Sequence, residues 1–139
     1  CGYFDYAAFE EKILPFIDLI YYDIKLASPD LHKKYTGKSN RKILSNLRRL
    51  LGQSQVEIHP RIPLIPGITA TEQNLTAILD LLNKMGAGEV SLLPYNPLGI
   101  DMAACLGRSR PPLPAEFMKP EEEERIFAAF ERMVRQRLV

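Results

Sequence analysis

LIYYDIK, residues 19–25, is the first of three stretches that decide the fold of this 139-residue chain. Like IHPRIPLIPG at 58–67 and VSLLPYNPLG at 90–99, it is an apolar run that ends in polar residues. The segments between the three runs carry apolar residues at helical spacing, so the sequence predicts strands that alternate with helices. That alternation is typical of a parallel sheet or barrel, in which ligands bind at the carboxyl ends of the strands.

Capping signals predict four helices around these strands. The helices are expected to begin after Asp5, Ser39 and Thr69 and at Pro120. Thr69 and Glu72 have the spacing of a capping box, and Gly86 ends the helix that follows. Gly52 is expected in the C′ position of the helix that Ser39 begins, where glycine accepts a left-handed backbone.

The expected strands are residues 19–26, 56–65 and 89–95. The second strand contains Pro60 and Pro63. Because proline has no N–H to donate to a ladder, we expect this strand to be irregular or bulged near its end. A loop is expected over residues 29–38, at the ligand end of the sheet. Its lysines and Tyr35 could bind a peptide backbone, although the commoner explanation of such residues is a charged loop exposed to solvent.

Composition limits the kinds of function. The apolar fraction of 46% and the charged fraction of 25% are ordinary for one globular domain. A net charge of +1 gives no broad electrostatic case for binding nucleic acid or an anionic membrane. No apolar run approaches the roughly 20 residues that span a bilayer. Cys1 and Cys105 lie too far apart to form a disulfide framework, a zinc motif or a cluster motif, so we expect two unpaired thiols in a reduced cytoplasm.

Asp23 and Lys25 are the first candidate site residues. Because they are two residues apart on a predicted strand, their side chains share one face with Tyr21. An amino-acid-like ligand can offer its ammonium group to Asp23 and its carboxylate to Lys25. From spacing alone, a satisfied ion pair at the rim of a barrel explains the two residues equally well.

Arg61 is the next candidate. It shares a face with Glu57 and His59 if the alternation survives the two prolines, and its planar guanidinium suits a carboxylate or ribose hydroxyl groups. Alternatively, Arg61 pairs with Glu57 or Asp23 and neutralises a charged interior. In either case we expect Arg61 to lie near Asp23.

Three ordered strings carry a resemblance to a known family: YDIKLASPDLHKKYTGKS at 22–39, RIPLIPG at 61–67 and LLPYNPLG at 92–99. At these separations they are similar to the second half of the glycyl-radical-enzyme activating enzymes. This is the family of pyruvate formate-lyase activating enzyme, within the radical S-adenosylmethionine enzymes. The similarity runs over nearly the whole chain. The CxxxCxxC motif that binds the family's [4Fe-4S] cluster is absent from the sequence.

The resemblance implies an α/β fold made of the C-terminal three βα units of a partial (β/α)6 TIM-like barrel with parallel strands. Residues 1–139 would form a single partial-barrel domain whose N-terminal half is absent. The strand at 19–25 would then have a bare edge, which favours dimerisation of the fragment. The fragment alone would be inactive.

The resemblance also implies cofactors, partners and site residues. S-adenosylmethionine would contact Asp23, Lys25, Arg61 and Asn96, whereas no catalytic residue and no metal ligand is expected in this chain. The [4Fe-4S] cluster would be bound by the absent half. Partners of the intact protein would be a glycyl radical enzyme, through its glycine-loop segment, and an electron donor such as flavodoxin or ferredoxin. Several relatives place histidine where Asn96 stands, so no proton-transfer role is implied, and plain turn chemistry explains Asn96 at least as well.

Two other functions stay open on the sequence. A non-catalytic interaction module could bind a protein through the open edge of the half-barrel and its basic loop. A βα enzyme could instead use Lys25 as a Schiff-base or general-base lysine. The adjacent Asp23 argues against the lysine enzyme, because a carboxylate favours the charged ammonium. The convergence of polar residues on the strand ends argues against the module.

Overall fold

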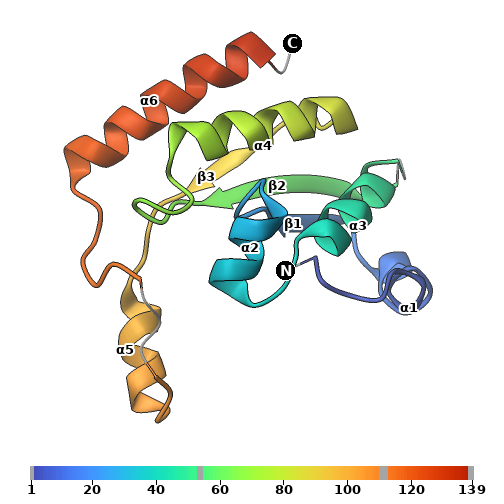
Figure 1. The fold of residues 1–139 in the computed structure, drawn as a ribbon. Helices are drawn as coiled ribbons and strands as arrows, with labels where there is room; N and C mark the ends of the chain where they lie inside the picture. The colour runs from blue at the N-terminus through green and yellow to red at the C-terminus, as the bar shows by residue number, and fades with distance from the viewer. Residues whose placement is uncertain (1, 53–54, 110–112, 138–139) are drawn as a thin grey trace.

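Three parallel strands form the centre of the computed structural model, which describes residues 2–52, 55–109 and 113–137 (Figure 1). The strands are β1 (Leu19–Asp23), β2 (Glu57–Pro63) and β3 (Ser91–Leu93), and they lie in the order β1-β2-β3. Both strand pairs are parallel. The predicted α/β class and the parallel strands are therefore confirmed.

Helices fill the connections and both ends of the chain. They are α1 (Tyr6–Lys12), the short 3-10 helix η1 (Leu14–Phe16), α2 (Pro29–Thr36), α3 (Arg41–Leu51), α4 (Glu72–Met85), α5 (Leu98–Cys105) and α6 (Pro120–Arg137). The last helix packs along α4, whereas α5 extends away from the sheet (Figure 1). Among the described residues, none of the helices is both long and apolar enough to cross a membrane.

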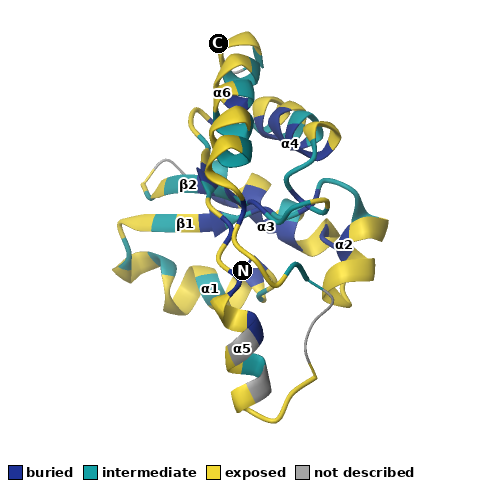
Figure 2. Cartoon of the chain, turned by 90° about the vertical axis from the view of Figure 1, so that its left-hand side faces the viewer, coloured by how far each residue is buried: buried dark blue, intermediate teal, exposed yellow. Residues whose placement is uncertain are grey.

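One face of the sheet is buried under α3 and α4, and Figure 2 shows the buried residues gathered there. From the strands, the side chains of Tyr22, Ile62 and Leu92 enter this core. From the helices, Leu47 and Leu79 are fully buried. Burial of a large apolar side chain stabilises the fold by about 1.5–3 kcal/mol. This core therefore fixes which face of each strand turns away from the helices.

The opposite face of the sheet, which we call the open face, carries the alternate strand residues. It includes Leu19 and Pro63, and its aromatic and ionisable side chains are those of Tyr21, Asp23, Lys25, Glu57, His59 and Arg61. None of these six residues is buried, and the Tyr21 residue is 56% exposed. Polar and ionisable groups thus gather on the one sheet face that the described helices leave accessible.

The expectation that β2 is irregular or bulged is wrong, because its two prolines avoid both ladders. Glu57 donates its backbone N–H to Asp18 on the β1 side, and Leu64 donates to Leu93 on the β3 side. Alternate residues of a strand direct their backbone groups to opposite neighbours, so Pro60 faces β3 and Pro63 faces β1. Pairing with β3 begins only at residue 61, and pairing with β1 ends at residue 61. The sheet therefore loses no hydrogen bond through the N–H groups that Pro60 and Pro63 lack.

The expected loop at 29–38 contains a helix, α2. Ser28 caps it by accepting a hydrogen bond from the Leu31 N–H at 3.3 Å, and Pro29 occupies the first turn. Gly37 ends the helix with a left-handed backbone, φ 79°. Only His32 of this helix is buried, so the apolar periodicity that predicts a helix is weak here.

Two expected caps are displaced along the chain. Thr71, and not Thr69, caps α4 by accepting from the Asn74 N–H at 3.2 Å. Asn40 is the N-cap residue of α3, but its side chain makes no capping hydrogen bond. Ser39 stands one residue earlier, and its Oγ accepts from the Arg41 N–H at 3.4 Å. Gly52 ends α3 with an ordinary right-handed φ of −78°, so the expected left-handed C′ glycine is wrong at this position.

The remaining helix predictions agree with the structure. Asp5 caps α1 by accepting from the Ala8 N–H at 2.9 Å. Gly86 ends α4 with a φ of 76°, and α6 begins at Pro120. Helix α5 was not expected, since it follows directly on Pro94 and Pro97 and contains Gly99 near its start.

Candidate functional site

The structure brings Asp23, Lys25 and Arg61 together at the carboxyl ends of β1 and β2. Asp23 and Arg61 stand opposite each other in the parallel register. The Nε and Nη2 atoms of Arg61 donate to Oδ1 of Asp23 at 3.0 and 2.9 Å. The Nζ atom of Lys25 lies 3.8 Å from Oδ2 of the same carboxylate. The expected proximity of Arg61 to Asp23 is confirmed.

The electrostatics of this trio favour an anionic group. One carboxylate faces two cations, which gives the trio a formal charge of +1. The side chains of Asp23, Lys25 and Arg61 are 25%, 34% and 28% exposed, so a ligand can reach them while solvent screening is reduced. Arg61 uses two of its three guanidinium nitrogens on Asp23, and Nη1 has no partner among the described residues. That nitrogen and Lys25 can donate to a carboxylate.

A second row of open-face residues lies behind the trio. The Arg61 guanidinium stands over the Tyr21 ring, 4.6 Å from its centre. Tyr21 makes an edge contact with the His59 ring at a centre-to-centre distance of 5.8 Å. His59 Nε2 lies 2.5 Å from Oε1 of Glu57, two residues earlier on the same strand. The alternation predicted that these residues share a face, but not that they form one continuous chain of contacts.

Two buried asparagines fix the segment that follows β1, and sequence reasoning missed both. Asn74 accepts from the Ala27 N–H at 2.9 Å and donates to the carbonyl oxygens of Lys25 and Thr69 at 3.0 and 2.9 Å. Asn40 donates to the carbonyl oxygens of Leu26 and Ala27 at 2.7 and 3.0 Å. Their only sequence signal is a polar residue next to an otherwise apolar helical stripe. Through these bonds the backbone of Lys25 is held against α4.

The segment after β2 is held by Thr69. This buried side chain donates to the Pro63 carbonyl oxygen at 2.5 Å and accepts from the Ile65 N–H at 2.6 Å. Thr69 thus closes the turn that follows β2, which explains why it does not serve as the helix cap. The strand end that carries Arg61 is fixed by this turn.

Asn96 lies apart from the trio in its interactions. Its side chain is exposed, and Oδ1 accepts from the Leu98 N–H at 3.0 Å. This is the geometry of an Asx turn that leads into α5. Within the described ranges, no hydrogen bond or ion pair joins Asn96 to Asp23, Lys25 or Arg61.

Other candidate groups have structural roles. The His32 ring nitrogen Nδ1 lies 2.6 Å from the Lys38 carbonyl oxygen and 2.9 Å from the Thr36 hydroxyl, so it fastens the end of α2. Tyr22 donates its hydroxyl to the Ile43 carbonyl oxygen at 2.7 Å, and burial raises the pKa of this phenol. Cys105 is an exposed free thiol, and Cys1 lies outside the described residues.

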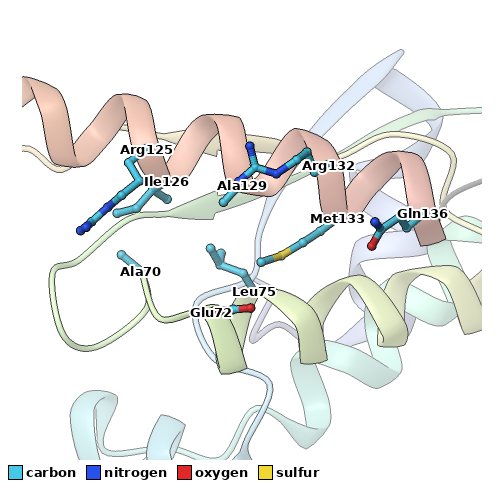
Figure 3. Close-up of a pocket in the computed structure, with 9 residues that line it drawn as sticks. All are labelled: Ala70, Glu72, Leu75, Arg125, Ile126, Ala129, Arg132, Met133 and Gln136. Atoms are coloured by element: carbon cyan, nitrogen blue, oxygen red, sulfur yellow. The ribbon is translucent and has the colours of Figure 1, made fainter.

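A groove of about 560 Å³ lies between α4 and α6 (Figure 3). It is lined by apolar side chains, among them Leu75, Ile126 and Met133, and by the charged residues Glu72, Arg125 and Arg132. None of the open-face residues lines it. In the part of the chain that the structure describes, no group of three histidine, cysteine or acidic residues could hold a metal ion.

Comparisons with known proteins give consistent matches. The chain is 40% identical over 101 residues to the trans-4-hydroxy-L-proline dehydratase activating enzyme of Clostridioides difficile. This alignment covers 71% of the chain and 33% of that protein. The chain is also 36% identical over 114 residues to the isethionate sulfite-lyase activating enzyme of Nitratidesulfovibrio vulgaris, covering 80% of this chain and 36% of that protein. The chain thus spans about a third of the length of these curated relatives.

A solved structure has the same fold. A domain of a pyruvate-formate lyase-activating enzyme from Bacteroides vulgatus superposes with a TM-score of 0.60 at 21% identity. The match covers 84% of this chain and 63% of that structure. No protein-family model matches the sequence.

Proposed function

We propose a function for this chain from its relation by sequence to the glycyl-radical-enzyme activating enzymes. Sequence matches that cover 70–80% of the chain confirm this relation. The chain would be part of an enzyme that uses S-adenosylmethionine to generate a glycyl radical on a partner protein. The observation that carries the proposal is the trio Asp23, Lys25 and Arg61 at the carboxyl ends of two adjacent parallel strands. Ligands of parallel α/β folds bind at this end of the sheet.

The trio suits the amino-acid end of S-adenosylmethionine. Lys25 and the free Nη1 of Arg61 would donate to the carboxylate of the cofactor. Asp23 would hold both cations in place and offer its own oxygens to the cofactor's ammonium group. Asn96 is proposed as a further contact on the resemblance alone. In the intact protein, a [4Fe-4S] cluster would supply one electron for the cleavage of bound S-adenosylmethionine to methionine, and the 5′-deoxyadenosyl group would leave with a hydrogen atom from a glycine of the partner.

A cluster does not fit the described residues. They contain one cysteine, Cys105, and no set of three grouped ligands. A [4Fe-4S] cluster is held by several cysteine thiolates. We therefore derive no step through a cluster from this chain and assign the cluster, with its flavodoxin or ferredoxin donor, to the intact protein. The free thiol fits a reducing cytoplasm.

The three βα units would form part of a partial (β/α)6 barrel whose interior is the open face. Support comes from the contrast between the two sheet faces, one apolar and buried, the other polar and accessible. The glycine-loop segment of the partner enzyme would approach at the same end, beside α2. There Lys33, Lys34 and Tyr35 are exposed and can contact a peptide.

Binding of S-adenosylmethionine to the intact protein, measured by calorimetry, tests this function; the fragment alone is expected to bind weakly or not at all. We expect Lys25→Ala and Arg61→Ala each to weaken binding by roughly 10- to 100-fold, since each removes a hydrogen bond to a charged group. Lys84→Ala and Arg132→Ala are matched controls, because both residues are exposed and lie on the helices α4 and α6, not at the strand ends. Undiminished binding by both site variants would sink the assignment.

A further inference from the structure

We propose that Tyr21 is a positioning residue that fixes the orientation of the Arg61 guanidinium on the open face. The inference rests on the proposed function, because it names the residue that orients Arg61 toward an anionic ligand. The evidence for it is a set of contacts within the chain. The Arg61 guanidinium is bounded by Asp23 along one edge and by the Tyr21 ring on one face.

Asp23 alone does not fix the plane of the guanidinium. Both of its hydrogen bonds from Arg61, at 3.0 and 2.9 Å, end on the single oxygen Oδ1. A single acceptor atom acts as a pivot about which the guanidinium can tilt, unlike a fork-to-fork pair that uses two oxygens. An aromatic ring stacked 4.6 Å from the guanidinium carbon limits that tilt.

The Tyr21 ring also contacts a second side chain of β2, that of His59. His59 touches it edge-on, with ring centres 5.8 Å apart and planes at 70°. His59 is in turn bound to Glu57 at 2.5 Å. Tyr21 and His59 are also paired in the strand register, so the backbone sets the spacing between the two rings. The ring therefore has a fixed position from which to act on Arg61.

The role belongs to the ring and not to the hydroxyl group. The Tyr21 hydroxyl has no hydrogen-bond partner among the described residues, and the residue is 56% exposed. Such exposure also means that little core packing depends on Tyr21. Tyr21→Phe keeps the ring and Tyr21→Leu removes it, so the two variants separate stacking from every other property of the residue.

The first test reads Arg61 directly, without any ligand. In the protein labelled with ¹⁵N-arginine, the Arg61 Nε–H signal is identified by its disappearance in Arg61→Lys. We expect Tyr21→Leu to speed solvent exchange of this proton about three- to tenfold, the factor that a cation–π contact of ordinary strength represents. Tyr21→Phe and the control Leu19→Ala, two residues earlier on the same face, should leave it unchanged. An unchanged Arg61 signal in Tyr21→Leu overturns the proposal.

The second test measures the S-adenosylmethionine affinity of the intact protein in a double-mutant cycle. Tyr21→Leu should weaken binding about three- to tenfold when Arg61 is present and have no further effect in Arg61→Ala. An equal loss in both backgrounds means that Tyr21 contacts the ligand or supports the fold, and overturns the positioning role. If the unaltered intact protein does not bind S-adenosylmethionine, the proposed function fails, and the exchange measurement alone decides the role of Tyr21.

Discussion

Replacing Asn74 by alanine should destabilise the fold far more than replacing another asparagine of the same helix. The side chain of Asn74 is buried and makes three hydrogen bonds, of 2.9, 3.0 and 2.9 Å, to the backbone of Ala27, Lys25 and Thr69. The alanine variant leaves one N–H and two carbonyl groups without this partner. Each lost bond to a buried group costs about 1 kcal/mol or more. We therefore expect the free energy of unfolding to fall by about 3 kcal/mol.

Asn83→Ala is the matched control for this prediction. Asn83 lies on α4 as well, but its side chain is exposed and makes no hydrogen bond among the described residues. Both variants gain the roughly 0.5 kcal/mol by which alanine exceeds asparagine in helix propensity, so that contribution largely cancels in the comparison. Urea unfolding with an unchanged m-value measures the difference between the two variants.

The outcome has a clear refutation. A difference between the two alanine variants below about 1 kcal/mol would show that the three bonds do not hold the end of β1. Asn74→Asp provides a further check, because a carboxylate can still accept from Ala27 but cannot donate to the two carbonyl groups. It should be at least as destabilising as alanine. Rescue by aspartate would refute the assigned donor roles.

Two further variants test the turn after β2 and the buried phenol. Thr69→Val should lower the free energy of unfolding by about 1–3 kcal/mol in urea, because the Pro63 carbonyl and the Ile65 N–H lose their partner, while Thr69→Ser should retain most of the stability. Burial raises the pKa of Tyr22, so the folded chain keeps this proton where the unfolded chain releases it, and stability should fall as pH rises above about 10. In Tyr22→Phe, the fall in the free energy of unfolding above pH 10 should be smaller by up to about 1.4 kcal/mol per pH unit. Because the variant loses the hydrogen bond to Ile43, its free energy of unfolding at neutral pH should be lower by about 1 kcal/mol. An unchanged alkaline slope would contradict the explanation.

Strong periodicity made the alternation of strands with helices, and the longer helices, predictable. The stripe that includes Leu75, Ile78 and Leu82 repeats at helical spacing and is buried as expected. Alternation also placed Asp23, Lys25 and Arg61 on one face, because side chains of a strand point to opposite sides in turn. These features depend on neighbours along the chain, which the sequence displays directly.

The errors arose where contacts outside a single helix or strand decide the local structure. Thr69 and Glu72 have the spacing of a capping box, but the carbonyl of Pro63 and the N–H of Ile65 bind the Thr69 hydroxyl first. Asn40 and Asn74 look like ordinary polar residues until the segment after β1 lies against them. Tertiary contacts of this kind leave no periodic signal.

The two prolines of β2 also limit how the chain can misfold. A shift of β2 by one residue against β1 would turn Pro60 toward β1, where a carbonyl oxygen then lacks a donor. A shift of two residues that sets Pro63 opposite Asp23 would also leave a carbonyl oxygen of β1 without a donor. Both slipped arrangements separate Arg61 from Asp23. The prolines therefore disfavour other registers of β2 against β1, and they favour the register in which Arg61 pairs with Asp23.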